Sequence, residues 1–186
     1  MRLRTVAILF LMGCGSEADP DSKLEAQEQT QGCTVSASAR FFWDATQVQY
    51  DYQPRRAQAL VEGSELVIRG RLRAIEPTSE TTRLTIEVEH IYKGDAALGS
   101  ELDVELGRSE AISASDFQRL AKNLPRDAVT LFLTPREGAL SLTTPQALLV
   151  SGPCGVAQAL DDAPIFAEPP SSDVALDAAL REITGR

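Results

Sequence analysis

The sequence predicts a mainly β domain in which five strands close into a Greek-key barrel, with a helix between the third and fourth strands. Two observations support this fold class. Apolar and polar residues alternate with a period of two through most of Glu65–Thr143, which is typical of half-buried strands. The alternation stops once for apolar residues that share one helix face, namely Phe117, Leu120, Ala121 and Leu124. The five expected strands are 66–74, 84–90, 102–106, 128–133 and 140–143.

The first two strands are expected to form an antiparallel hairpin with arginine–glutamate pairs on its outer face. One register places Arg71 opposite Glu87 and Arg69 opposite Glu89. A second register places Arg71 opposite Glu89 and Arg73 opposite Glu87, and a third leaves only Arg69 against Glu87. The first two registers make a ladder of ion pairs, which selects a register more than it adds stability, because exposed pairs contribute little.

Further elements are indicated on both sides of these strands. The segment Ala128–Leu133 is apolar on both faces and therefore reads as a central strand. A short helix is expected at Arg55–Glu62, ended by Gly63. A C-terminal helix is expected at Asp173–Ile183, with Ser172 as its N-cap.

The order of three strands, a helix and two strands is that of an OB-fold. The stretch Leu66–Leu142 also resembles the barrel of netrin-type and metalloproteinase-inhibitor-like domains found in many uncharacterised secreted bacterial proteins. The segments that carry the resemblance are ELVIRGRLRAIEP, TRLTIEVEHIYKGD, GSELDVELG and DAVTLFLTPREGALSLTTPQALLV. They cover less than half of the chain. The resemblance implies a fold and protein–protein binding rather than a reaction.

The N-terminus has the organisation of an export signal. Arg2 and Arg4 precede the apolar run Val6–Met12, which is far shorter than the roughly 20 residues that span a bilayer. The following Leu11-Met12-Gly13-Cys14 resembles the lipobox of bacterial lipoproteins. The resemblance implies that residues 1–13 are removed and that Cys14 carries the lipid, with palmitate among its acyl chains. An ordinary signal peptide is the alternative, although its cleavage site prefers small residues on both sides of one spacer.

Three regions are therefore expected: a lipoprotein signal peptide at 1–13, a flexible tether at 14–32 and a single domain at 33–186. The tether is polar and cannot bury enough surface to offset the entropy of ordering. The net charge of −9 becomes about −11 without Arg2 and Arg4, which argues against nucleic acid as a partner. We expect a lipid-anchored protein of the cell envelope, on the outer membrane of a Gram-negative bacterium and facing the periplasm or the cell surface.

The cysteines predict one disulfide bond. With Cys14 lipidated, Cys33 and Cys154 remain as an even pair in an oxidising compartment. The alternative is a reactive thiol at Cys154. A nucleophilic cysteine needs a base such as histidine, and His90 is the single histidine of the sequence.

Other chemistry is weakly indicated, and no cofactor or metal is expected. His90 follows Val88 on the same parity and is interpreted as a structural histidine on the apolar face. Glu87 and Glu89 have the composition of paired catalytic carboxylates, but they face the arginines of the preceding strand and are interpreted as an ion-pair ladder. Asp161-Asp162 lacks the oxygen-rich spacing of a calcium loop.

The aromatic residues before the barrel leave two interpretations open. They either close one end of the barrel or form an exposed platform for a glycan or a partner protein; they are Phe41, Phe42, Trp43, Tyr50 and Tyr52. The leading hypothesis is a non-enzymatic module that binds an envelope protein or a cell-wall polymer. A protease-inhibitor-like domain is the second hypothesis, although the family's zinc-chelating N-terminal cysteine is not matched here. A hydrolase that uses Cys154 or Ser109 is the third.

Overall fold

The computed structural model describes residues 53–78, 81–107, 128–152, 155–158 and 164–186. All of them belong to one compact unit, Gly32–Arg186. Its helices are α3 (Ala57–Gly63) and α5 (Asp173–Thr184). Its strands are β1 (Leu66–Pro77), β2 (Thr81–Lys93), β3 (Glu101–Gly107), β4 (Ala128–Arg136), β5 (Ala139–Leu142), β6 (Leu148–Gly152) and β7 (Gly155–Gln158).

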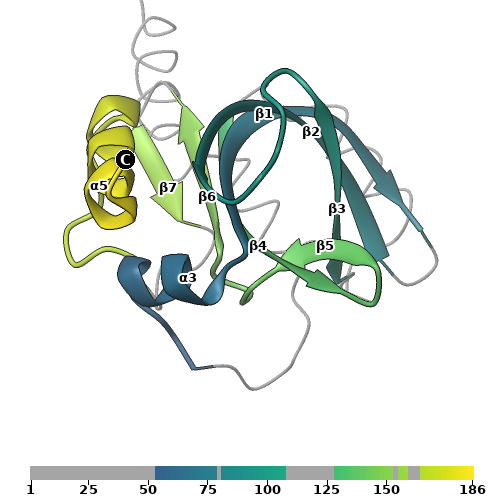
Figure 1. The fold of residues 1–186 in the computed structure, drawn as a ribbon, viewed down its shortest axis with the longest axis horizontal. Coiled ribbons are helices and arrows are strands. Elements are labelled where there is room, and N and C mark those ends of the chain that lie inside the picture. The colour runs from purple at the N-terminus through teal and green to yellow at the C-terminus, as the bar shows by residue number, and fades with distance from the viewer. Residues whose placement is uncertain (1–52, 79–80, 108–127, 153–154, 159–163) are drawn as a thin grey trace, which may run out of the picture. The chain divides into compact units, whose positions relative to one another are not determined.

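The strands of the described residues form one mixed sheet in the order β1-β2-β3-β5-β4-β6-β7, and an additional pairing of β1 with β4 closes the first five into a ring (Figure 1). Within the ring, β3 and β5 run parallel. The expected mainly β class is confirmed. The ring of five strands is not a clean barrel, because β4 also pairs with β6 and the sheet continues outside the ring to β7.

The predicted hairpin of β1 and β2 is antiparallel, and its register agrees with the first of the three alternatives at its centre. Arg71 lies opposite Glu87. The second half of that prediction is wrong, because Arg69 lies opposite His90 rather than Glu89. The register shifts between Arg69 and Gly70, and such a bulge places an extra residue on one strand and turns the following side chains to the other face.

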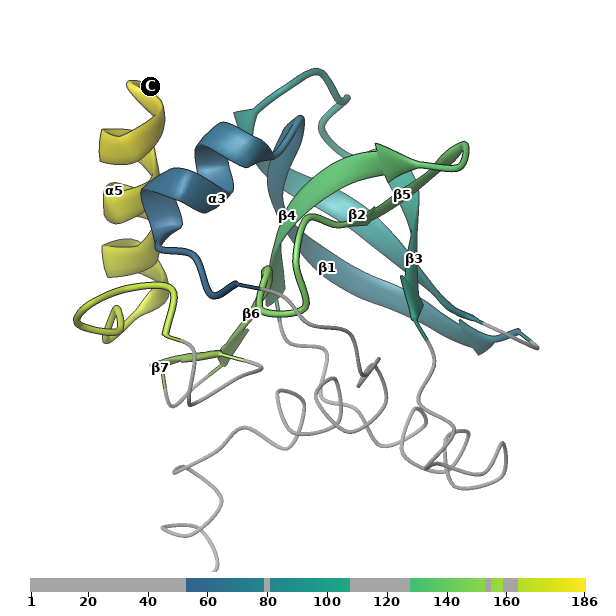
Figure 2. The same ribbon diagram turned by 90° about the horizontal axis from the view of Figure 1, so that it is seen from below.

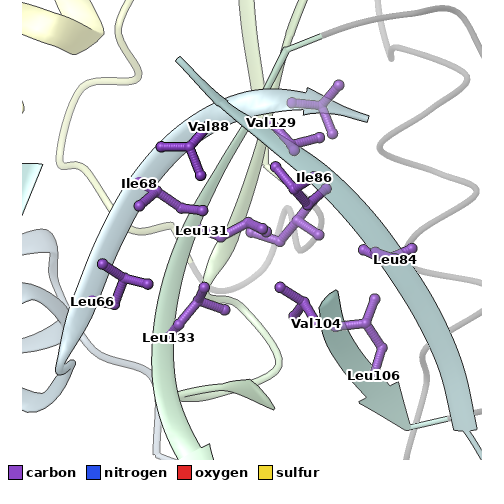
Figure 3. Close-up of a cluster of buried hydrophobic side chains, with 12 residues drawn as sticks. Leu66, Ile68, Leu84, Ile86, Val88, Val104, Leu106, Val129, Leu131 and Leu133 are labelled. Carbon is purple, nitrogen blue, oxygen red and sulfur yellow. The ribbon is translucent and has the colours of Figure 1, made fainter. Parts of the chain in front are cut away.

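The interior of the ring is an apolar core. The alternating residues of β1, β2 and β3 meet the inner residues of β4 and β6 there (Figure 3). Leu84, Ile86 and Leu131 are fully buried in it. Each such side chain stabilises the fold by about 1.5–3 kcal/mol through burial. The complete buried set is Leu66, Ile68, Leu84, Ile86, Val88, Val104, Leu106, Val129, Leu131, Leu133, Leu148 and Val150.

A second core lies on the outer face of β1, β4 and β6, where α3 and α5 cover the sheet (Figure 2). Val67, Phe132 and Leu149 come from the strands, and they pack with Leu60 of α3 and with Leu176 and Leu180 of α5. Strand β4 therefore buries both faces, which confirms the central strand predicted at Ala128–Leu133.

The two helices within the described residues lie before β1 and at the C-terminal end. Helix α5 begins after Ser172, whose side chain accepts a hydrogen bond from the backbone N–H of Ala175, so the predicted cap is confirmed. Helix α3 begins two residues later than the prediction at Arg55. The helix predicted around Phe117 lies outside the described residues. Within the described part of the chain, neither helix combines the length and apolar character needed to cross a membrane.

Candidate functional site

Most residues predicted to carry function lie outside the described part of the chain. These are Cys14, Cys33, Cys154, Phe41, Phe42, Trp43, Tyr50 and Tyr52, together with Ser109, Asp161 and Asp162. Lipid attachment, the disulfide bond and the aromatic platform therefore remain predictions.

The two glutamates of β2 do form the expected ladder on the outer face of the hairpin. Arg71 and Glu89 make an ion pair of 2.8 Å, and Arg73 pairs with Glu87. The pairs are diagonal rather than directly opposed, since Arg71 lies opposite Glu87 in the register. All four side chains are partly exposed. Each of the two glutamates is bound by an arginine that is in contact with solvent. Glu87 and Glu89 therefore form part of a charged surface and are not arranged as an acid–base couple.

His90 does not lie on the apolar face, and the prediction that it does is wrong. The bulge before it places His90 opposite Arg69, and its side chain is exposed. Its ring stacks on that of Tyr92, with the ring centroids 6.4 Å apart and the planes inclined by 22°. The histidine is therefore a surface residue at the edge of the contact between α5 and the sheet.

Tyr92 is the polar residue that sequence reasoning missed. It is 2% exposed and belongs to the second core. Its hydroxyl donates a hydrogen bond of 3.0 Å to the Asp177 carboxylate of α5. Burial, followed by this bond, raises the pKa of the Tyr92 phenol above its ordinary value of 10.0. Its parity with Val88 and His90 would have placed it in the ring, and the bulged register directs it instead toward α5.

The Asp177 carboxylate is shared between Tyr92 and Arg181. Arg181 lies one turn further along α5 and donates through Nε at 2.7 Å. This bond is the main reason that the pKa of Asp177 falls below its ordinary value of 3.8, and the bond from Tyr92 acts in the same direction. Asp177 is thus held as a carboxylate that accepts from both the sheet and its own helix.

A second carboxylate fastens the start of the same helix. Asp173 accepts a bond of 2.6 Å from Arg69 of β1, whose side chain is 16% exposed. Asp173 and Asp177 are four residues apart and therefore lie on one face of α5. Together they attach the helix to neighbouring strands at two points, Asp173 to β1 and Asp177 to β2.

The described residues were also considered as ligands for a metal ion. The described residues contain no group of three or more histidine, cysteine, aspartate or glutamate side chains able to hold a metal ion. The site defined by the structure is accordingly the polar contact between α5 and the outer face of β1 and β2.

No protein-family model matches the chain, and no curated protein matches it.

Proposed function

We propose that this chain is an exported lipoprotein of the cell envelope, anchored through lipid on Cys14, whose folded domain binds another molecule and catalyses no reaction. The observation that carries the proposal is the N-terminal pattern of two arginines, the apolar run Val6–Met12 and Leu11-Met12-Gly13-Cys14. A run of this length is a signal rather than a membrane span. Two or three acyl chains on Cys14 would hold the protein firmly, whereas one would hold it only marginally.

We assign the ring of strands to an OB-like Greek-key barrel. Three features support the assignment: β1, β2 and β3 follow one another as neighbours, β5 and β4 return to β1, and β3 is parallel to β5. The ring's interior is packed with apolar side chains, so a partner would bind on the outer surface or at the loops. The partner we propose is an envelope protein or a cell-wall polymer, with the aromatic segment Phe41–Tyr52 as the binding surface.

The anchor is tested by metabolic labelling of the full chain with a palmitate analogue in a bacterial host. We expect wild type to be labelled and Cys14→Ser to remain as an unlabelled, uncut precursor in the inner membrane. Cys33→Ser is the matched control and should be labelled like wild type. A Cys14→Ser chain that is still cut and still labelled would show that the lipoprotein proposal is wrong.

The binding role is tested by cross-linking the full chain in the envelope and by co-sedimentation with isolated cell wall. We expect Phe42→Ala and Trp43→Ala to reduce the recovered partner or polymer, while Leu98→Ala, a change at a residue that is 68% exposed in the loop after β2, should not. Unchanged recovery in both aromatic variants would remove the aromatic segment from the proposal.

The hydrolase hypothesis is distinguished by thiol titration of the unfolded, unreduced protein. The proposed disulfide predicts that neither Cys33 nor Cys154 reacts. Two reactive thiols would exclude the disulfide and restore a nucleophilic Cys154. The inhibitor-like hypothesis is tested on a panel of purified metalloproteinases, and dose-dependent inhibition by the full chain would favour it.

A further inference from the structure

Four buried polar atoms, three on the outer face of β1, β4 and β6 and one in the first turn of α5, have no hydrogen-bond partner among the described residues. They are Arg69 Nε, Asp173 Oδ1, Thr130 Oγ1 and Ser151 Oγ. Thr130 is 0% exposed and Ser151 is 3% exposed. Buried polar atoms in folded proteins are nearly always hydrogen-bonded, because leaving one unpaired is unfavourable. Their grouping therefore points to a bound molecule.

The strand register makes the residues that carry these atoms neighbours on one face of the sheet. Arg69 of β1 lies directly opposite Thr130 of β4. Ser151 of β6 lies opposite Ala128, and is therefore a diagonal neighbour of Thr130. All of these side chains project from the outer face of the sheet, which also carries Phe132 and the rest of the second core. The ion pair between Arg69 and Asp173 brings in the fourth atom from α5.

The chemistry of the four groups selects the kind of molecule. The guanidinium of Arg69 and the carboxylate of Asp173 compensate each other, so the Asp173 carboxylate disfavours an anion and the Arg69 guanidinium disfavours a cation. Arg69 Nε can only donate, Asp173 Oδ1 can only accept, and the two hydroxyls can do either. A neutral molecule that both donates and accepts satisfies this set, and the near-complete burial of Thr130 and Ser151 requires it to be small.

We propose that this polar site, formed by Arg69, Thr130, Ser151 and Asp173, binds ordered water between α5 and strands β1, β4 and β6. A buried water that makes about three hydrogen bonds to such groups is part of the folded structure and is unfavourable to remove. The water links the hydroxyls of β4 and β6 to the ion pair that holds the start of α5. Helix α5 is therefore attached to the sheet both by apolar contacts and by a water-mediated polar contact.

The chain provides a matched control for this site. Thr82 is 1% exposed, and its hydroxyl also lacks a partner among the described residues. It lies in β2 between Pro77 and Leu106 and on the parity of the inner core residue Leu84, so it faces a different side of the sheet. Thr82→Val therefore leaves the proposed site intact, whereas Thr130→Val removes one of the groups that hold the water.

The experiment compares Thr130→Val, Ser151→Ala and Thr82→Val in the full chain, purified in detergent and unfolded with urea. We expect Thr130→Val to raise the unfolding equilibrium constant roughly fivefold or more, and Thr82→Val to change it less. The Thr130→Val/Ser151→Ala double variant should lose less than the sum of the single losses, because both hydroxyls bind the same water. A Thr130→Val chain at least as stable as wild type overturns the proposal.

A crystal structure of the wild-type chain gives an independent readout if Thr130→Val does not fold. We expect electron density for a water within hydrogen-bond distance of at least two of the four atoms. Well-ordered density for Thr130, Ser151 and Arg69 with nothing between them overturns the proposal, as does density for an ion.

Discussion

Arg69 of β1 and Asp173 of α5 are joined by an ion pair of 2.6 Å across the outer face of the sheet. Arg69 belongs to the arginines that alternate with the core residues of β1, yet it does not join the ladder of its neighbours Arg71 and Arg73. The start of α5 covers it and reduces its side-chain exposure to 16%, compared with 48% for Arg71. One strand face thus changes from a solvent-exposed ladder to a covered helix contact between two successive outward residues.

We expect Asp173→Asn to destabilise the protein by about 1 kcal/mol. The change removes the charge partner of the covered Arg69. It also removes an acidic residue from the first turn of α5, where a negative charge interacts favourably with the helix dipole. The value is modest because Asp173 is 41% exposed and solvent screens the pair. Urea unfolding followed by circular dichroism measures it. Glu182→Gln, an exposed change on the same helix, is the control, and equal losses in both would contradict a specific role for the pair.

Tyr92→Phe should destabilise the protein by about 1 kcal/mol, because it removes the bond to Asp177 and keeps the buried ring. Alkaline absorbance titration provides a second measurement. The folded-state pKa of Tyr92 is raised, so its contribution to stability is complete below pH 10.0 and is lost as the pH rises through the folded value. We expect one tyrosine to ionise later than the others, and Tyr92→Phe to remove that late step. A late step that persists in the variant would contradict the assignment.

The Asp177 carboxylate predicts acid sensitivity. Its folded-state pKa is lowered, chiefly by Arg181, so the stability it contributes is present above its ordinary value of 3.8 and is lost as the pH falls through the lower folded value. We expect the urea midpoint to fall between about pH 5 and pH 2. Asp177→Asn should be less stable than wild type at neutral pH and should show a shallower fall. An identical acid profile in Asp177→Asn would show that this group is not responsible.

The hairpin ladder and the core beneath it should respond very differently to a new charge. Glu87→Lys replaces the partner of Arg73 by a like charge on a partly exposed face, and we expect a loss of under about 1 kcal/mol. Ile86→Asp places a carboxylate at a fully buried position and should prevent folding. Circular dichroism and gel filtration distinguish the outcomes. A folded Ile86→Asp chain would contradict the register.

Gly70 should not tolerate a side chain. A Cβ built there lies 2.3 Å from the backbone oxygen of Glu87 and 2.6 Å from Cγ2 of Ile86, so Gly70→Ala must push β1 and β2 apart where the register shifts. We expect a loss of more than about 3 kcal/mol or no folding. Gly138→Ala is the control: no atom lies within 4 Å of its Cβ, although its φ is +88°, and it should lose only about 1 kcal/mol. Similar losses in both variants would contradict the close approach at Gly70.

The alternating pattern predicted the hairpin well where the strands are regular. Leu72 lies opposite Ile86, and Arg71 lies opposite Glu87, because inward and outward residues follow period two between the bulges. The same reasoning fails for His90 and Tyr92. Bulges arise from the local fit of two strands to their neighbours, and a single strand's hydrophobic pattern carries no signal for them.

The other omissions come from tertiary partners. Strands β6 and β7 were not predicted, because the apolar run Ala147–Val150 is short and is bounded by Pro145 and Gly152. Its role as a strand depends on pairing with β4, which is separated from it in the sequence by β5. The helical spacing of Leu176 and Leu180 did indicate an apolar face on α5. It could not indicate that Asp173 and Asp177 would meet Arg69 and Tyr92.

Strand β4 has a consequence for the rate at which the domain folds. It pairs with β1, β5 and β6, so neither the ring nor the outer core can be completed before it is in place. The hairpin of β1 and β2 is local, whereas the pairing of Leu66 with Leu133 joins distant parts of the chain. Loop closure of this kind carries an entropic penalty before any contact compensates it, and non-local sheets fold slowly for that reason. Until β4 has paired with β1, the sheet of β1, β2 and β3 therefore stays open along the edge of β1.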